Sequence, residues 1–344
     1  MKTMRVAVYY NNNDVRLEER PVPEIGPGEL LVKVISSGIC GSDVMEWYRV
    51  KKAPLVLGHE IAGQITEIGA GVDRFKIGDR VFVSHHVPCN QCHYCQSGNH
   101  TVCDTLRSTN FDPGGFSEYI RVPAINVQNG TFILPDKVSF EEGTIIEPLA
   151  CVVRGQQKAR LKPGQSVLVI GSGISGILHA QLARASGAKR IFATDISEFR
   201  IATARRFGAD AAFLASDDIP ERIKHANGGC LADLVIVCAA APQAISQALQ
   251  SVERGGSILL FASLMPEQTF PIPIYQLWRD SITLTASYAG SPADIAQAIE
   301  LIRSRSIDAQ GMVTHRLGLA ETGLGFQLVA RAENSLKVVI EPQR

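Results

Sequence analysis

Four of the eight cysteines in this chain of 344 residues lie within fifteen consecutive positions. The segment reads PCNQCHYCQSGNHTVC, with the spacing C-x2-C-x2-C-x7-C, and its cysteines are Cys89, Cys92, Cys95 and Cys103. Four thiolates at such close spacing can surround one tetrahedral Zn²⁺ at roughly 2.3 Å each. Because protein groups then fill every position around the metal, no place is left for a substrate. The pattern therefore predicts a structural zinc.

A disulfide knot and an iron–sulfur cluster are the alternatives for this segment. Disulfides belong to oxidising compartments, whereas the N-terminal MKTMRVAVYYNNND lacks the long apolar stretch of a secretory signal. We therefore expect a cytoplasmic protein with reduced thiols. The spacing also fits neither common ferredoxin pattern. Zinc would hold in place a lobe that has little apolar content of its own.

A second set of residues with metal-ligand chemistry surrounds this segment in the sequence. It comprises Cys40, Ser42 and Asp43 in SSGICGSDVMEW, His59 and Glu60 in PLVLGHEIAGQI, and Glu147 in IIEPLACVV. A soft thiolate, an imidazole and one or two carboxylates can bind Zn²⁺ and leave one position open. An open zinc lowers the pKa of bound water to about 7, and we expect an alcohol oxygen to respond similarly. Whether Glu60 or Glu147 is the direct ligand stays open.

A glycine-rich turn follows the apolar strand VLVI, with the pattern G-x-G-x-x-G at Gly171, Gly173 and Gly176. The first glycine permits a tight turn, the second lets the backbone approach a pyrophosphate, and the third allows close helix packing. Asp195 ends the next strand, RIFATD, where a carboxylate accepts hydrogen bonds from the ribose hydroxyls and repels a 2′-phosphate. The Asp195 carboxylate therefore favours NAD. Arg200 could lie against the adenine, or its positive charge could weaken the repulsion of the NADP 2′-phosphate. The candidate cofactor-binding residues are Gly171, Gly173, Ile174, Ser175, Gly176, Asp195, Arg200, Ala239, Phe261 and Ala262.

The pattern of apolar, glycine and proline residues changes near residue 150. Residues 1–149 contain short β-like runs broken by Gly and Pro, which indicates a β-rich domain. Residues 150–286 alternate apolar strands with helical stretches, which predicts a parallel sheet covered on both faces. Residues 287–344 contain the helical pattern SPADIAQAIELIRS and the strand-like LKVVIEP.

The composition excludes some classes of partner. The 34 basic and 34 acidic residues give a net charge of +0, so there is no electrostatic case for nucleic acid or an anionic membrane. No apolar run reaches the roughly 18 residues of a membrane span. A small molecule is therefore the expected partner.

The motifs GICGSD, GHE, GGFSEY, EPLA and GSGISG, together with the four-cysteine segment, make the chain resemble the zinc-dependent medium-chain dehydrogenase/reductases over essentially its whole length. It looks most similar to their polyol and sugar-alcohol dehydrogenases, of the sorbitol and idonate type. This resemblance implies an α/β protein with a GroES-like β-rich catalytic domain and a doubly wound Rossmann domain that binds NAD. It also implies that residues 287–344 return to the catalytic domain, and that the protein is a homo-oligomer, either a dimer or a tetramer.

The resemblance further implies roles for single residues. Cys40, His59 and Glu60 match the positions of a catalytic zinc, and Glu147 matches an acid that binds the metal directly or through its water. Ser42 matches the hydroxyl that takes the substrate proton.

Other positions carry less definite expectations. Asp43 matches a residue near the metal ligands. Met45 stands where many relatives have a histidine that passes the proton to water, so we expect water to complete the transfer. His85 and His86 are expected only to belong to a loop that leads into the four-cysteine segment.

The predicted function is hydride transfer between a secondary hydroxyl of a polyol, sugar acid or cyclitol and NAD, with one catalytic and one structural zinc per chain. One alternative is a threonine-type amino-alcohol dehydrogenase, against which EPLA argues. A more distant alternative is a non-catalytic dinucleotide-binding protein of the same fold, which we would expect to have lost its zinc ligands.

Overall fold

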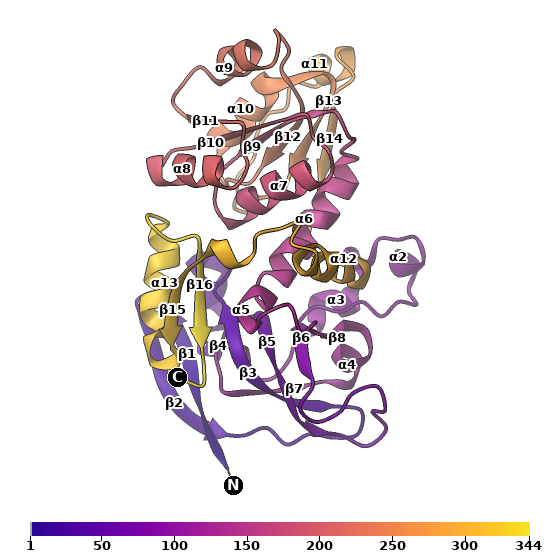
Figure 1. Ribbon diagram of the computed structural model, residues 1–344, viewed down its shortest axis with the longest axis vertical. Coiled ribbons are helices and arrows are strands. Elements are labelled where there is room, and N and C mark those ends of the chain that lie inside the picture. Colours follow the sequence, from indigo (N-terminus) through magenta and orange to yellow (C-terminus); the bar gives the residue numbers. More distant parts are fainter. Residues whose placement is uncertain (1) are drawn as a thin grey trace. The chain divides into compact units, whose positions relative to one another are not determined.

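The computed structural model describes residues 2–344, and the chain divides into two compact units (Figure 1). Unit 1 comprises Met1–Ala150, Gly290–Ser304 and Ala309–Arg344. Unit 2 comprises Cys151–Ala289 and Arg305–Asp308. No helix in the described part of the chain is long and apolar enough to cross a membrane.

Unit 2 is built on a parallel sheet with the strand order β11-β10-β9-β12-β13-β14. Its strands are β9 (Ser166–Ile170), β10 (Arg190–Asp195), β11 (Ala211–Leu214), β12 (Ala232–Val237), β13 (Val252–Leu260) and β14 (Thr283–Ala286). Every residue of β9 is buried, as expected of a central strand covered on both faces. The order reverses between β9 and β12, which is the topology of a doubly wound dinucleotide-binding sheet. The predicted α/β class is thus confirmed.

Helices connect these strands. They are α7 (Ile174–Ala185), α8 (Glu198–Arg206), α9 (Ile219–Ala226), α10 (Pro242–Ser251) and α11 (Ile274–Arg279), and α6 (Ile146–Ala159) contains the boundary between the units. Helix α7 contacts β9 and β10, and α10 contacts β9, β12 and β13. The carboxyl ends of β9 and β12 are therefore held at the point where the strand order reverses.

Unit 1 contains two sheets. One has the order β2-β1-β4, with β1 (Thr3–Asn11), β2 (Asp14–Pro21) and β4 (Leu55–Val56). The other has the order β15-β16-β3-β5-β6-β8, and β7 also pairs with β3. Its strands are β3 (Leu30–Gly38), β5 (Glu60–Ile68), β6 (Arg80–Ser84), β7 (Tyr119–Val122), β8 (Thr131–Ile133), β15 (Val313–Gly318) and β16 (Lys337–Glu341). The C-terminal strand β16 thus pairs with β3 near the start of the chain.

Short helices and turns join the strands of unit 1. The α-helices are α1 (Glu46–Arg49), α2 (His93–Gln96), α3 (Asp104–Ser108), α4 (Ala124–Gly130), α5 (Phe140–Gly143), α12 (Pro292–Arg303) and α13 (Thr322–Arg331). The 3₁₀ turns are η1 (Val50–Lys52), η2 (His100–Val102), η3 (Gln310–Met312) and η4 (Leu319–Glu321).

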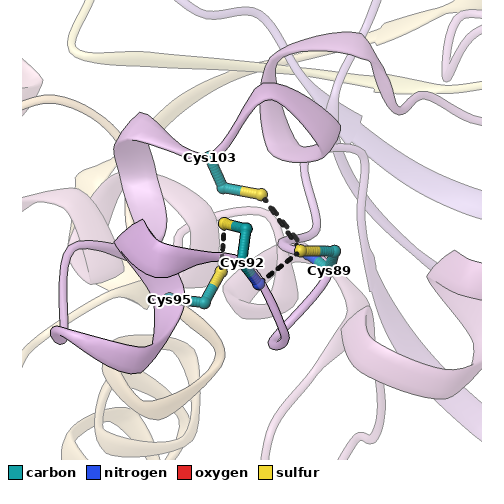
Figure 2. Close-up of side chains that lie close together, drawn as sticks. All are labelled: Cys89, Cys92, Cys95 and Cys103. Carbon is teal, nitrogen blue, oxygen red and sulfur yellow. Dashed lines mark hydrogen bonds between the residues drawn. The ribbon is translucent and has the colours of Figure 1, made fainter.

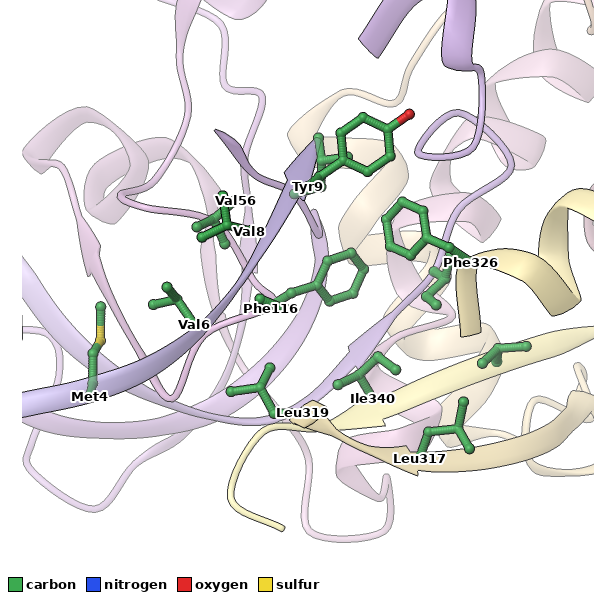
Figure 3. Close-up of a cluster of buried hydrophobic side chains, with 14 residues drawn as sticks. Met4, Val6, Val8, Tyr9, Val56, Phe116, Leu317, Leu319, Phe326 and Ile340 are labelled. Atoms are coloured by element: carbon green, nitrogen blue, oxygen red, sulfur yellow. The ribbon is translucent and has the colours of Figure 1, made fainter. Parts of the chain in front are cut away.

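The two ends of unit 1 share one hydrophobic core (Figure 3). Phe326 of α13 packs against two aromatic rings, with centroids 5.4 Å from Tyr9 and 5.7 Å from Phe116. Ile340 of β16 belongs to the same cluster. Burial of these side chains removes apolar area from water and fixes β16 beside the N-terminal strands.

Candidate metal centres and cofactor site

The four cysteines of residues 89–103 gather in one place (Figure 2). Their sulfur atoms all lie within 4.8 Å of one another, and the Cys92–Cys95 and Cys89–Cys103 sulfurs are each 3.6 Å apart. All four are free thiols. The donor set and spacing fit a tetrahedral zinc with four protein ligands.

The backbone of this lobe already favours negative charge on two of the sulfurs. The amide of Gln91 donates to the Cys89 sulfur and lowers the pKa of that thiol. Burial raises the pKa of Cys103, but backbone amides, including that of Cys89, outweigh it and lower the pKa to about 6. Burial raises the pKa of Cys95 to about 12, so this thiol requires a cation to become a thiolate.

A second ligand group consists of Cys40, His59 and Glu60, whose ligand atoms also lie within 4.8 Å of one another. Strand pairing explains their proximity. β3 and β5 are antiparallel with Gly38 opposite Glu60, so Cys40 just after β3 meets His59 just before β5. A thiolate, an imidazole and a carboxylate fit zinc with room for a further ligand.

Asp43 is fully buried next to this group and contacts two of its members, Cys40 and His59. Its Oδ2 accepts a hydrogen bond from the Cys40 amide at 3.1 Å, and its Oδ1 lies 3.3 Å from His59 Nδ1. Burial raises the pKa of Asp43, but the charge of His59 outweighs this and holds it below its usual value. Burial likewise lowers the pKa of His59, but Asp43 and Cys40 raise it well above its usual value. A histidine oriented through Nδ1 presents Nε2 to a metal.

Ser42 lies next to the ligand group through its backbone, and its hydroxyl is held by Arg49. The Ser42 amide donates to the Cys40 sulfur at 3.4 Å. Arg49 donates from Nε to the Ser42 carbonyl at 2.9 Å and from Nη2 to Ser42 Oγ at 3.2 Å. Arg49 could not be predicted from the sequence, because a lone arginine in a short helix belongs to no recognisable motif.

Three other residues complete the description of this region. Glu147 lies in the first turn of α6 and is half-buried; its role as a metal ligand stays a prediction. Lys337 of β16 forms a buried ion pair with Glu60, which sequence reasoning missed. His85 lies in the loop that follows β6, and its ring packs against that of His59.

The glycine turn of unit 2 has the geometry that its motif requires. Gly171 has a φ of +94°, a region that favours glycine. A Cβ at Gly176 would collide with the carbonyl oxygen of Gly171, whereas a Cβ at Gly173 would meet only Arg200 Nη1, at 3.7 Å. The helix α7, with Ile174 and Ser175 in its first turn, begins directly after Gly173. Its first N–H groups are therefore available to a phosphate.

The remaining candidate cofactor residues lie around the carboxyl ends of β10, β12 and β13. Asp195 accepts hydrogen bonds from the amides of Ser172 at 2.7 Å and Ser197 at 3.1 Å. A Cβ at Gly171 would lie 3.1 Å from that of Ala239. The amides of Phe261 and Ala262 both donate to the carbonyl of Val237.

Two family models match this chain. Residues 26–134 match the family model "Alcohol dehydrogenase GroES-like domain", and residues 175–304 match "Zinc-binding dehydrogenase". The chain is 31% identical to the sorbitol dehydrogenase of Bacillus subtilis (strain 168), over 100% of this chain and 98% of the relative. It is 33% identical to that of Gallus gallus, over 97% and 95%.

Among solved structures, a zinc-binding dehydrogenase from Sinorhizobium meliloti 1021 bound to NADP has a TM-score of 0.88 at 26% identity. The match covers 99% of this chain and 100% of that chain. The predicted family, the GroES-like domain and the enzyme class are confirmed by these comparisons. The chain therefore belongs to the zinc-dependent medium-chain dehydrogenase/reductases, in the branch that contains the sorbitol dehydrogenases.

Proposed function

We propose that this protein transfers a hydride between a secondary hydroxyl of a polyol, sugar acid or cyclitol and NAD. The observation that carries the proposal is the group of Cys40, His59 and Glu60, within 4.8 Å of one another and next to the hydroxyl-bearing Ser42. The sorbitol dehydrogenases similar to this chain take their name from a polyol, which supports this substrate class.

The reaction divides between the bound groups and the chain's own side chains. When bound, zinc supplies a Lewis acid and nicotinamide supplies the hydride acceptor. Ser42 Oγ takes the proton of the substrate hydroxyl, and Arg49, which donates to the same oxygen, orients it. Asp43 fixes the ring of His59. Because the thioether of Met45 carries no exchangeable proton, the proton passes from Ser42 to water.

The choice of NAD over NADP rests on Asp195. Backbone amides of Ser172 and Ser197 hold its carboxylate at the end of β10, beside the glycine turn. A carboxylate there binds the ribose hydroxyls and repels a 2′-phosphate. Arg200 supplies a positive charge near Gly173 and reduces this repulsion without reversing it.

The protein is also proposed to be a homo-oligomer, a dimer or a tetramer, in the cytoplasm. Ile274, Tyr275 and Trp278 of α11 are largely exposed, and large apolar side chains gathered at a surface are typical of interfaces. Strand β14, at the end of the parallel sheet, offers a strand edge for pairing. Light scattering tests this: a mass that remains that of one chain would contradict it.

A substrate panel tests the catalytic proposal. Zinc-loaded protein is assayed for NADH formation with polyols, sugar acids, cyclitols and L-threonine. We expect the highest kcat/KM with one of the first three classes. L-Threonine as the best substrate would favour the amino-alcohol alternative, and no turnover at full zinc occupancy would favour the non-catalytic one.

A further inference from the structure

A buried ammonium group lies next to the catalytic ligand group. Lys337 Nζ forms an ion pair with Glu60 Oε2 and donates a second hydrogen bond to the Ile39 carbonyl, at 3.4 Å. The side chains of Lys337 and Glu60 are each only 1% exposed. Buried lysines are rare unless they are paired, so this position requires an explanation.

The strand register builds this ion pair. In β3, Gly38 lies opposite Val339 of β16 on one side and opposite Glu60 of β5 on the other. A Cβ at Gly38 would lie 2.5 Å from both Glu60 Oε2 and Lys337 Cε. The ion pair therefore crosses β3 at a position that a glycine leaves open.

The charges around the ligand group explain what the ammonium does. Asp43 is balanced by Arg49, at 3.5 Å, and by His59, at 3.3 Å. Glu60 is equally buried, and its Oε2 is paired with the ammonium group of Lys337. Removing one partner of a buried ion pair leaves an uncompensated charge, which is strongly destabilising. Lys337 therefore supplies a buried positive charge beside the Glu60 carboxylate before a metal arrives.

We propose that Lys337 is the counter-ion of Glu60 in the metal-free protein, that it competes with zinc for this carboxylate, and that it thereby lowers the metal affinity of the site. The ammonium and the metal ion are both cations within reach of one carboxylate, so each weakens binding of the other. The inference rests on the metal site of the proposed function and not on its substrate.

The competing explanation is that Lys337 only orients Glu60 as a ligand. Outer-shell groups that orient ligands raise metal affinity, and their loss typically weakens it by roughly 10–100-fold. The two explanations therefore predict opposite signs for the same substitution.

The experiment measures metal binding by the full chain without substrate or cofactor. Lys337→Met removes the charge and keeps much of the volume, and Lys337→Arg, which keeps the charge, is the matched control. Each protein keeps zinc in the four-cysteine lobe, is emptied at the Cys40 site by a chelator, and is titrated with Co²⁺. The thiolate-to-metal absorption of Cys40 reports binding. We expect Lys337→Met to bind Co²⁺ at least about tenfold more tightly than the natural protein, and Lys337→Arg to bind within about threefold of it.

An unchanged or weaker affinity in Lys337→Met would overturn the proposal. Thermal unfolding gives a second measurement: Lys337→Met should lower the Tm of the metal-free protein more than that of the zinc-loaded protein, because zinc takes over the neutralisation of Glu60. Equal losses would also overturn it. If Lys337→Met does not fold without metal, Lys337→Gln is compared instead by removing zinc from the loaded protein with a chromophoric chelator. Because no substrate is present, these results are independent of which alcohol the enzyme oxidises.

Discussion

The imidazole of His85 packs against that of His59, with ring centroids 4.7 Å apart. The contact follows from the pairing of β5 with β6, in which Glu60 lies opposite Ser84, so the residues next to them meet. The ring centroid of His86 lies 3.8 Å from that of His85, so three imidazoles pack one after another. The proposed metal ligand His59 is thus supported by an imidazole that the sequence assigns only to a loop.

We expect His85→Ala to lower kcat/KM by about tenfold or more with little change in Tm, because residues that position a metal ligand typically act on that scale. Burial holds the pKa of His85 well below its usual value, so the ring is neutral and does not repel a metal. The exposed His93 provides the control, His93→Ala. Equal kcat/KM and zinc content in the two variants would contradict the supporting role.

Cys95→Ser should remove one zinc per chain and lower the free energy of unfolding by about 4 kcal/mol or more, because loss of a structural metal is among the most damaging changes. The protein that remains folded should keep most of its kcat, since this lobe leaves no position for substrate. Cys230→Ser, at an exposed free thiol, is the control. Elemental analysis and denaturant unfolding measure both effects; an unaltered zinc content would be inconsistent with the assignment.

Asp195→Ser should raise the ratio of kcat/KM for NADP to that for NAD by roughly 10–100-fold, because it removes both the ribose contacts and the repulsion of a 2′-phosphate. Asp195→Asn keeps the shape and removes the charge, so it separates the two effects. The measurement is the kcat/KM ratio for both cofactors, together with Tm because Asp195 also binds two backbone amides. If the ratio does not change in either variant, Asp195 does not select the cofactor.

Ser42→Ala should lower kcat by about a hundredfold, the scale of a lost proton-transfer group. Met45→Leu should change kcat by less than about twofold, because it conserves volume. Met45→His should raise the rate of oxidation below neutral pH if proton release limits turnover there, since an imidazole titrates near about 6.5. The pH–rate profiles of the three variants measure this. A loss in Met45→Leu as large as in Ser42→Ala would show that the thioether has a specific role.

His179 should make the protein sensitive to acid. Its ring is fully buried, packs edge-on against Phe261 with centroids 4.5 Å apart, and burial lowers its pKa to about 3. The unfolded chain binds a proton near pH 6.5 while the folded chain does not, so stability falls as the pH drops below that value, by about 1.4 kcal/mol per pH unit.

His179→Leu should abolish this part of the pH dependence between about pH 6 and pH 4. His225→Asn, at an exposed position, should not. Denaturant unfolding at several pH values gives the slopes. Parallel slopes for His179→Leu and the natural protein would show that His179 takes up its proton normally when folded.

Features with a strong local signal could be predicted from the sequence. The alternation of apolar strands and helices after residue 150 gives the parallel sheet, because a strand covered on both faces must be apolar throughout. The four cysteines meet because only short loops separate them. Gly171 takes the left-handed φ that its motif implies. Cys40 and His59 lie close together because the end of β3 and the start of β5 are neighbours in an antiparallel pair.

The contacts that escaped prediction depend on the register between strands distant in the sequence. Lys337 meets Glu60 only because β16 pairs with β3 beside Gly38. His85 reaches His59 only through the pairing of β5 with β6. A lysine in an apolar strand or a histidine after one carries no periodic pattern. Such residues acquire their roles from tertiary structure alone.

The pairing of β16 with β3 also sets the order in which the enzyme matures during synthesis. Glu60 leaves the ribosome 277 residues before Lys337, and Cys151–Ala289 is translated in between. Until β16 emerges, Glu60 has no ammonium partner and β3 lacks its neighbour beside Gly38. Unit 2 can therefore fold on the nascent chain, whereas unit 1 is completed only afterwards. A ribosome-bound chain arrested before Lys337 would carry Cys40, His59 and Glu60 of the proposed catalytic site, but the buried Glu60 would lack its ammonium partner.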